Sequence, residues 1–204
     1  MLRLQCGTEN IARIRQSRLA VLKTSSKLYD YGLTTGHGVP EDRPCIVRDF
    51  DGRYAAIDVI TYAQNYKSGT RTDWAILRFE KITTPNLVRY DINSVQTDIS
   101  IDGMEINFAR AKGLPDNKQK CHLEILSFSN NNQKISHSCR SFNGQSGTPV
   151  TKIINNQEKL IGLHVGQLWM HTSPVTGKPD RKGYINLLDE EMVAEIKDII
   201  RQNS

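Results

Sequence analysis

From residue 19 onward, short apolar segments alternate with clusters of glycine, proline, aspartate and asparagine. The segments are rich in valine, isoleucine, tyrosine, threonine and leucine, which favour β-strands, whereas the residues between them favour turns. This pattern predicts an all-β protein, with strands at 19–24, 28–34, 45–49, 54–61, 74–79, 104–110, 121–128, 134–139, 148–154, 159–166 and 183–186.

Turn residues connect several of these strands in pairs. Hairpins are predicted around Asp51-Gly52, around the asparagines at 130–132 and around Asn155-Asn156. Residues 113–120, which include a proline, are predicted to form a loop.

Residues 81–102 are more polar and less periodic than the rest of the chain. We interpret them as a connection between two β halves. The predicted organisation is therefore an N-terminal segment with a first half (1–80), the connection (81–102), a second half (103–187) and a C-terminal element (188–204) that together form one domain.

The two ends of the chain show helical patterns. Residues 8–16 have apolar positions on one side and predict a short helix. The C-terminal 188–204 segment is amphipathic, and Asn186 followed by Asp189 resembles a capped start. Its apolar stripe consists of Leu188, Met192, Ile196, Ile199 and Ile200.

Length and charge narrow the classes of function. The 204 residues suit one domain or two small halves that share a core. Lysine and arginine exceed acidic residues by 27 to 22, but they are spread without a basic block, so nucleic-acid binding is not expected. There is no long apolar run, so no membrane span is expected, and no secretory signal is visible at the start. These features do not assign a compartment: a cytoplasmic location and secretion without a standard signal are both left open.

The four cysteines show no metal-binding or disulfide spacing and are predicted to be free, buried thiols in a reducing compartment. A zinc site is the alternative, because Cys121, His122, His137 and Cys139 lie at the ends of a predicted hairpin. Neighbouring strand residues point to opposite faces, which makes four-way ligation by this set awkward, so no metal is expected. A Cys121–Cys139 disulfide would require an oxidising compartment.

Three residues could together perform acyl transfer. Ser146 lies in a glycine-rich turn, where its hydroxyl can be exposed and nearby backbone N–H groups can converge. His37, at the end of an apolar strand, is a candidate base, and Asp73, at the start of a buried strand, is a candidate orienting acid. Taken singly, each also fits an ordinary loop or strand-edge position.

The segments around these residues resemble the chymotrypsin-like (trypsin-like) serine peptidase superfamily. The sequence LTTGH ending at His37 resembles the family's LTAAH motif, DWAIL beginning at Asp73 resembles its aspartate motif, and GQSGTP around Ser146 resembles its GDSGGP motif. The order histidine, aspartate, serine is also that of chymotrypsin.

This resemblance implies two six-stranded antiparallel β-barrels, with the active site between them and the C-terminal helix packed on the second barrel. It implies a serine endopeptidase that cleaves proteins or peptides and needs no cofactor. The oligomeric state is not determined by the sequence, and a monomer is expected. Ser146 would be the nucleophile, His37 the base and Asp73 the orienting acid. The N–H groups of Gly144 and Ser146 would form the oxyanion hole.

Some residues depart from the family pattern. Gly36 and Gly38 flank His37 where the family usually has alanine and cysteine. Gln145 stands before the serine, where activated zymogens have an aspartate that pairs with a freed N-terminus. The glutamine therefore indicates that the chain does not use that activation route.

The sequence GLHVG at 162–166 resembles the pocket segment of glutamyl endopeptidases and picornaviral chymotrypsin-like proteases. The resemblance implies that His164 and Ser141 contact a Glu or Gln side chain before the scissile bond, with Gly166 also in the pocket. Arg140 would lie at the pocket base, where an inward cation would also favour an acidic side chain. A satisfied core histidine is the alternative for His164, and a loop position is predicted for His171.

Two alternatives to a constitutively active peptidase are kept. One is a non-catalytic protein-binding module on the same fold. The other is a latent protease that needs a partner to order residues 142–145.

Overall fold

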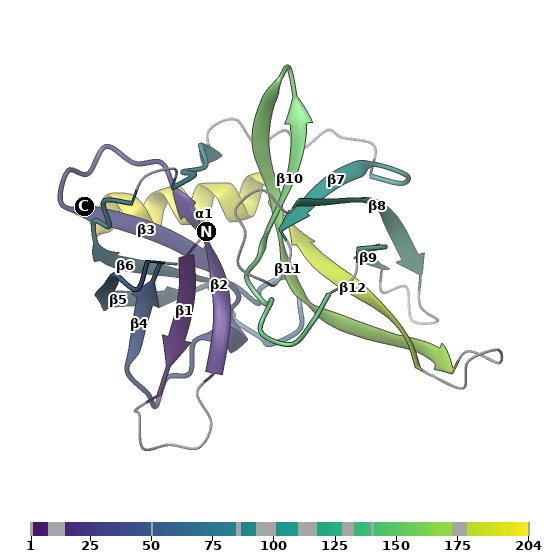
Figure 1. Cartoon of the computed structure of the whole chain (residues 1–204), viewed down its shortest axis with the longest axis horizontal. Helices are drawn as coiled ribbons and strands as arrows, with labels where there is room; N and C mark the ends of the chain where they lie inside the picture. Colours follow the sequence, from purple (N-terminus) through teal and green to yellow (C-terminus); the bar gives the residue numbers. More distant parts are fainter. Residues whose placement is uncertain are drawn as a thin grey trace.

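The computed structural model describes residues 2–7, 15–49, 51–84, 87–92, 101–109, 118–127, 133–139, 141–172 and 179–203. The described chain forms two closed, six-stranded antiparallel β-barrels that lie side by side, followed by one C-terminal helix (Figure 1). This architecture confirms the predicted all-β, two-barrel fold.

The first barrel has the strand order β1-β2-β3-β6-β5-β4. Its inward side chains, including Leu4, Leu19, Val47, Leu77 and Phe79, form a buried core. Its strands are β1 (Leu2–Cys6), β2 (Arg15–Leu22), β3 (Tyr29–Thr34), β4 (Cys45–Arg48), β5 (Tyr54–Tyr62) and β6 (Ala75–Glu80), and a short 3-10 helix, η1 (Gly36–Gly38), follows β3.

The second barrel has the order β10-β11-β12-β9-β8-β7. Its core includes Ile106, Phe108, Leu123, Val150 and Ile185. Its strands are β7 (Glu105–Ala109), β8 (Lys118–Ser127), β9 (Gln133–His137), β10 (Pro149–Ile154), β11 (Gln157–Thr172) and β12 (Pro179–Leu187).

Turn chemistry explains two of the predicted hairpins. Gly52 has a φ of 86° between β4 and β5, and Asn155 and Asn156 have φ values of 51° and 59° between β10 and β11. Glycine and asparagine tolerate these left-handed conformations, which the tight turns of hairpins require. The third predicted turn, at 130–132, lies outside the described residues.

Several predicted boundaries were wrong. Strand β1 was not predicted, although Leu2, Leu4 and Cys6 alternate inward as a half-buried strand should. The predicted helix at 8–16 is wrong at its end, because residues 15 and 16 belong to β2, and the rest lies outside the described residues. The loop predicted at 113–120 is wrong for 118–120, which belong to β8. His171 lies in β11 and not in a loop.

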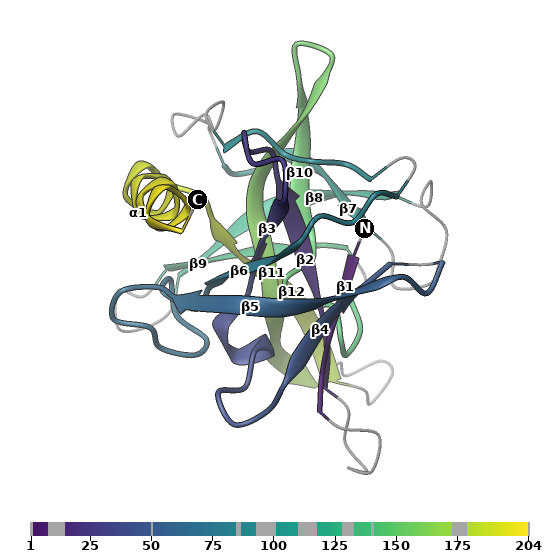
Figure 2. The same ribbon diagram turned by 90° about the vertical axis from the view of Figure 1, so that its left-hand side faces the viewer.

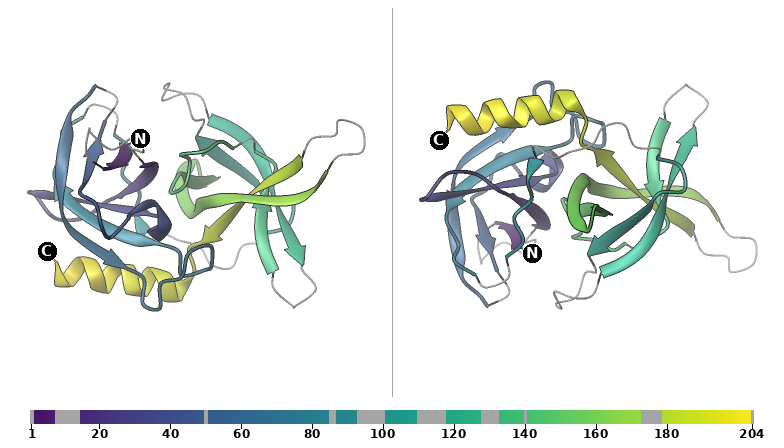
Figure 3. Two further views of the ribbon diagram at one scale, coloured as in Figure 1. Left: turned by 90° about the horizontal axis from the view of Figure 1, so that it is seen from below. Right: turned by 90° about the horizontal axis from the view of Figure 1, so that it is seen from above.

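The C-terminal helix α1 (Glu190–Gln202) lies along the first barrel, as Figures 2 and 3 show. The prediction that it packs on the second barrel was therefore wrong. Its buried face, with Met192, Val193 and Ile196, contacts a cluster that contains Tyr31 and Trp74 of the first barrel. Within the described residues, no helix is both long and apolar enough to span a membrane.

The cap of the helix lies three residues later than Asn186, the residue that was predicted to start it. Asp189 is the N-cap residue, and its Oδ1 accepts a hydrogen bond from the backbone N–H of Met192 at 2.9 Å. Asn186 instead belongs to β12. An N-cap carboxylate stabilises a helix by about 1 kcal/mol because it satisfies an otherwise unpaired N–H group.

The prediction of free thiols was wrong. Cys6 is bonded to Cys45, and Cys121 is bonded to Cys139. Cys6 and Cys45 are direct partners in the β1–β4 pairing, so the disulfide crosses two adjacent strands. Cysteine spacing along the chain does not reveal the Cys6–Cys45 pair, because β1 and β4 are not consecutive strands. Cys121 and Cys139 lie on the consecutive strand segments around the β8–β9 pairing, at the ends of the predicted hairpin.

We predict that the protein unfolded without reductant contains no alkylatable thiol, and that all four thiols react after reduction. The bonds close loops of 39 and 18 residues, so each should stabilise the fold by about 3 to 4 kcal/mol in the chain-entropy treatment. Iodoacetamide labelling followed by intact mass measurement checks this. Four labelled cysteines before reduction would contradict it.

Candidate active site

Neighbouring strands of the first barrel bring His37 and Asp73 together. His37 lies in η1, just after β3, and Asp73 lies two residues before β6. Strands β3 and β6 pair antiparallel with Thr34 opposite Ala75, so the end of β3 and the start of β6 lie at the same edge. This pairing brings together two residues that are 36 positions apart in the sequence.

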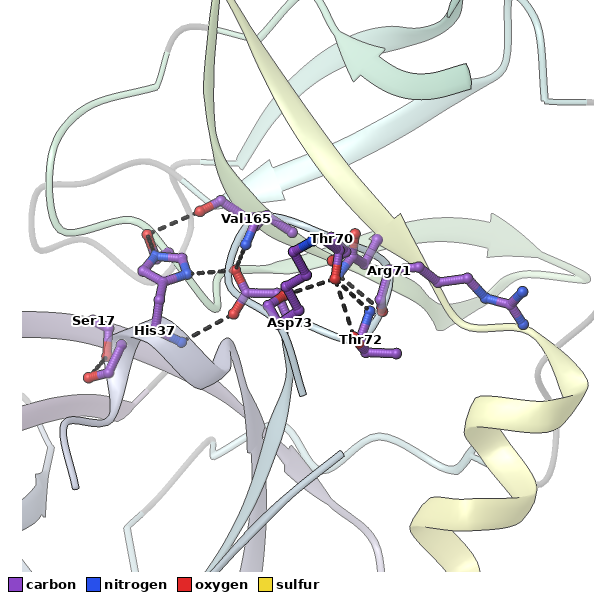
Figure 4. Close-up of polar contacts among 12 residues, drawn as sticks. Ser17, His37, Thr70, Arg71, Thr72, Asp73 and Val165 are labelled. Carbon is purple, nitrogen blue, oxygen red and sulfur yellow. Dashed lines mark hydrogen bonds and ion pairs between the residues drawn. The ribbon is translucent and has the colours of Figure 1, made fainter. Parts of the chain in front are cut away.

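Asp73 is fully buried and accepts three hydrogen bonds. Its Oδ2 lies 2.7 Å from His37 Nδ1 and accepts from the Gly69 N–H at 2.6 Å, while its Oδ1 accepts from the His37 N–H at 2.9 Å (Figure 4). Burial alone would raise the pKa of Asp73, but these hydrogen bonds outweigh it and hold the pKa below its ordinary value. The carboxylate is therefore ionised at neutral pH, and the imidazole is held with Nδ1–H toward it.

Ser146 lies at the other side of the imidazole. Its Oγ is 2.9 Å from His37 Nε2 and 3.1 Å from the carbonyl oxygen of Val165. With the Nδ1 proton directed to Asp73, Nε2 is the acceptor for the serine hydroxyl. The Val165 carbonyl is a second acceptor for the same proton.

The Ser146 turn is attached to both barrels. The Arg18 N–H of β2 donates to the Ser146 carbonyl at 2.8 Å, and the Gly147 N–H donates to the His164 carbonyl of β11 at 2.8 Å. Gly147 has a φ of 81°, and a Cβ there would lie 2.0 Å from the Arg18 carbonyl oxygen. Only glycine therefore allows the turn to approach the first barrel this closely.

The residues before Ser146 form a tight turn. The Gln145 N–H donates to the Phe142 carbonyl at 3.3 Å, and Gly144 has a φ of 83°. Within the described part of the chain, the N–H groups of Gly144 and Ser146 donate to no acceptor. These are the two N–H groups that the sequence predicts for an oxyanion hole.

The second barrel also holds the loop that contains Asp73. Asn186 of β12 donates from Nδ2 to the carbonyl oxygens of Thr70 and Arg71 at 2.9 and 3.3 Å, and Lys134 of β9 donates to the Gly69 carbonyl at 3.3 Å. Figure 4 shows Thr70, Arg71 and Thr72 next to Asp73. No sequence motif indicates this role for Asn186 or Lys134, because these contacts join segments more than 60 residues apart.

His164 lies in a buried pair of imidazoles. His137 Nε2 is 2.9 Å from His164 Nδ1, and Phe108 contacts both rings. Burial lowers the pKa of His137 to about 4, and burial together with the neighbouring His137 lowers the pKa of His164 well below its ordinary value. Both rings are therefore neutral at pH 7, and His137 is a partner that the sequence analysis considered only for metal binding.

The other predicted pocket residues are arranged differently. Ser141 accepts two hydrogen bonds from Gln167 Nε2, at its carbonyl oxygen (2.7 Å) and at its Oγ (3.1 Å). Within the described residues, Ser141 makes no hydrogen bond with His164. Gly166 lies against the ring of Tyr184, and Arg140 lies outside the described residues. Gln167, which is three residues after His164 in β11, was not predicted.

One cluster of described residues has metal-ligand chemistry. Potential ligand atoms of Cys121, His137 and Cys139 lie within 4.8 Å of one another. Both sulfur atoms are joined in a disulfide, so zinc binding there would require reduction of that bond. His122 is exposed on the opposite strand face from Cys121, as the alternation along β8 requires.

Comparisons with known proteins give a consistent fold assignment. No family model matches the chain, and no curated protein matches it. Solved structures do match: kallikrein-related peptidase 10 in complex with Zn2+ has a TM-score of 0.59 and 14% identity, covering 98% of this chain and 95% of that chain. A protein named GrC has a TM-score of 0.63, 10% identity and coverages of 98% and 93%.

A thermostable serine protease, AL20, from an extremophilic microorganism has a TM-score of 0.60 and 10% identity, covering 90% of this chain and 88% of that chain. The chain therefore has the fold of the chymotrypsin-like serine proteases. Low identity over nearly complete coverage means that the shared feature is the two-barrel architecture.

We predict that stability falls as the pH drops from about 6.5 toward about 4. A histidine with a lowered native pKa binds protons more readily in the unfolded chain, so acid favours unfolding in this window. The His137 shift alone corresponds to about 2 to 3 kcal/mol between pH 7 and 4.5. Urea unfolding at pH about 7 and at pH about 4.5 measures this difference in the free energy of unfolding.

Replacing His137→Leu should reduce this pH-dependent loss, whereas replacing the exposed His122→Gln should leave it unchanged. An equal loss of stability in the His137→Leu variant and the parent protein would contradict the assignment.

Proposed function

We propose that the protein is a serine endopeptidase that hydrolyses peptide bonds in proteins through an acyl-enzyme. The observation that supports this most directly is the continuous hydrogen-bonded chain from Asp73 through His37 to Ser146. It combines a buried carboxylate, an imidazole of defined orientation and a partly exposed hydroxyl. These are the parts needed to activate a weak nucleophile.

In the proposed mechanism, Ser146 Oγ attacks the carbonyl carbon of the scissile bond while His37 Nε2 accepts its proton. Asp73 stabilises the resulting imidazolium and keeps Nε2 directed at the serine. His37 then donates the proton to the leaving amine, and a water molecule repeats the sequence on the acyl-enzyme. Atoms and charges balance at each step without a cofactor.

The negative charge on the tetrahedral intermediate is proposed to be stabilised by the N–H groups of Gly144 and Ser146. Both belong to the turn that contains the nucleophile, and neither donates to another described acceptor. Donors that are already oriented need no reorganisation when the oxyanion forms, and the loss of one typically costs about 100- to 1,000-fold in rate.

We further propose a preference for Glu or Gln before the scissile bond. A neutral His137 that donates from Nε2 to His164 Nδ1 places the remaining His164 proton on Nε2. An imidazole in this tautomer can donate to a carboxylate or carboxamide oxygen. The hydroxyl of Ser141 and the amide of Gln167, which lie 3.1 Å apart and are hydrogen-bonded to each other, are further polar groups proposed to contact this side chain.

A non-catalytic binding module on the same fold is the second candidate. The intact histidine, aspartate and serine favour catalysis over this alternative, because a binding surface does not require their hydrogen-bonded chain.

We predict that a fluorophosphonate probe labels the folded protein and that Ser146→Ala abolishes the labelling. The probe reacts only with a serine whose proton is removed by a neighbouring base. His37→Ala should reduce labelling by at least about 1,000-fold, since the base is lost. Ser138→Ala, an exposed serine outside the site, is the matched control.

In-gel fluorescence measures this labelling. Absence of labelling in well-folded protein would contradict the peptidase proposal and favour the binding module.

We predict that peptides with Glu or Gln before the scissile bond are cleaved with the highest kcat/KM. His164→Ala should lower kcat/KM about 10- to 100-fold for the Glu and Gln peptides, because these substrates lose a hydrogen bond to the pocket. For a matched peptide with Ala at the same position, kcat/KM should fall less than about 3-fold. Ser141→Ala is a second pocket variant, and His122→Ala is the control.

Matched peptide sets with Glu, Gln, Ala, Lys and Phe at this position provide the measurement. A cleavage profile dominated by Lys, Arg or aromatic residues would overturn the specificity proposal while leaving the peptidase proposal intact.

A further inference from the structure

Gln145 is buried, although it lies in an exposed turn next to the proposed nucleophile. Its side-chain Oε1 accepts a hydrogen bond from the Phe142 N–H at 2.6 Å. Its own N–H donates to the Phe142 carbonyl at 3.3 Å. Residues 142 and 145 are thus joined by two hydrogen bonds in opposite directions, one from the side chain and one from the backbone.

The backbone carbonyl of Gln145 accepts hydrogen bonds from Thr148, the residue that precedes strand β10. It accepts from the Thr148 N–H at 2.9 Å and from the Thr148 Oγ1 hydroxyl at 2.6 Å, and Thr148 is buried at the start of the β10–β11 pairing. The Thr148 carbonyl in turn accepts from the His164 N–H at 2.9 Å. Gln145 therefore connects the exposed 142–145 turn to the rigid second barrel.

The conformation of this turn decides where one N–H group points. A φ of 83° at Gly144 is the value for the third residue of a type II turn, whereas a type I turn has a negative φ there. The two turn types differ by rotation of the peptide between Asn143 and Gly144. Glycine accepts both conformations without a Cβ penalty, so the identity of this residue does not select one.

The outer side of the turn is exposed to water. Asn143 is exposed, and Phe142 is 45% exposed. Water competes for backbone groups at such positions, which weakens the preference for one turn type. A hydrogen bond to the oxygen of a buried amide, as the Phe142 N–H donates to Gln145, is shielded from this competition and is correspondingly more effective.

We propose that Gln145 is a positioning residue: its side chain locks the 142–145 turn in the conformation that offers the Gly144 N–H to the oxyanion. This inference rests on the proposed peptidase function. The lock includes a neutral hydrogen bond between two residues of the turn itself, from the Phe142 N–H to Gln145 Oε1. It favours a constitutively formed oxyanion hole over a latent one that a partner must order.

The test compares Gln145→Met with Gln145→Glu. Methionine has a similar length but no strong acceptor, whereas glutamate keeps an acceptor oxygen at the same position. We expect Gln145→Met to lower kcat about 10- to 100-fold with KM within about 2-fold, because one oxyanion donor is no longer held in place. Gln145→Glu should retain at least a third of the parent kcat.

A second readout is specific for the oxyanion hole. Affinity for a peptide aldehyde inhibitor, whose adduct has an oxyanion, should fall in Gln145→Met by the same factor as kcat/KM. The acid limb of the pH–rate profile should stay unchanged, because His37 and Asp73 are not altered. Gln157→Met, at an exposed glutamine in the β10–β11 hairpin, is the matched control and should behave as the parent protein.

Three outcomes are informative. Parent-like kcat and aldehyde affinity in Gln145→Met would overturn the positioning role. If Gln145→Met does not fold, Gln145→Asn decides: its amide is too short to reach Phe142, so parent-like activity in that variant would also overturn it. Failure of the parent protein to react with fluorophosphonate would instead refute the peptidase proposal.

Discussion

The contact between the Ser146 turn and strand β2 determines the rest of the site. At this point the Arg18 N–H binds the Ser146 carbonyl, and the Arg18 carbonyl lies where a Cβ of residue 147 would be. The contact holds the serine of the second barrel against the first barrel, next to His37. A side chain at residue 147 would force the two barrels apart, and the 2.9 Å distance between His37 Nε2 and Ser146 Oγ would be lost with it.

Burial of Asp73 is the second constraint, and it depends on the first. A carboxylate without water must be stabilised by protein donors, and here the donors are the His37 ring, the His37 backbone and the Gly69 backbone. Asn186 and Lys134 of the second barrel hold the loop that contains Gly69 and Asp73. Packing of the barrels thus stabilises the ion and defines the tautomer of the histidine at the same time.

Local sequence features predicted much of this structure. Alternating apolar residues and turn signals located eleven of the described strands, ten of them to within four residues at each end, whereas β11 extends six residues beyond its predicted end. The amphipathic 188–204 segment predicted the helix. The motifs around His37, Asp73 and Ser146 predicted residues that the fold does bring together. What these predictions have in common is that each depends on residues close together in the chain.

The errors concern contacts between distant segments. Cysteine spacing did not predict the Cys6–Cys45 disulfide, because the two residues become neighbours only through the β1–β4 pairing. The helix was placed on the wrong barrel because its apolar stripe specifies that it packs, but not against which surface. His137 was predicted as an alternative zinc ligand, and its pairing with His164 depends on the register of β9 with β12 and of β12 with β11.

The glycine-rich turn around Ser146 shows most clearly which features depend on local sequence and which depend on tertiary structure. The sequence by itself determined that this turn is tight, that its serine is the candidate nucleophile and that Gln145 replaces the aspartate of activated zymogens. Only the tertiary structure decided what holds the turn: the Gln145 side chain on Phe142, and the Arg18 backbone on Ser146. Backbone dihedral preferences are local and can be read along the chain. The Arg18 contact, in contrast, joins segments of two different barrels, and the Gln145 side chain bonds to the nearby Phe142 N–H from a buried position that only the folded structure creates.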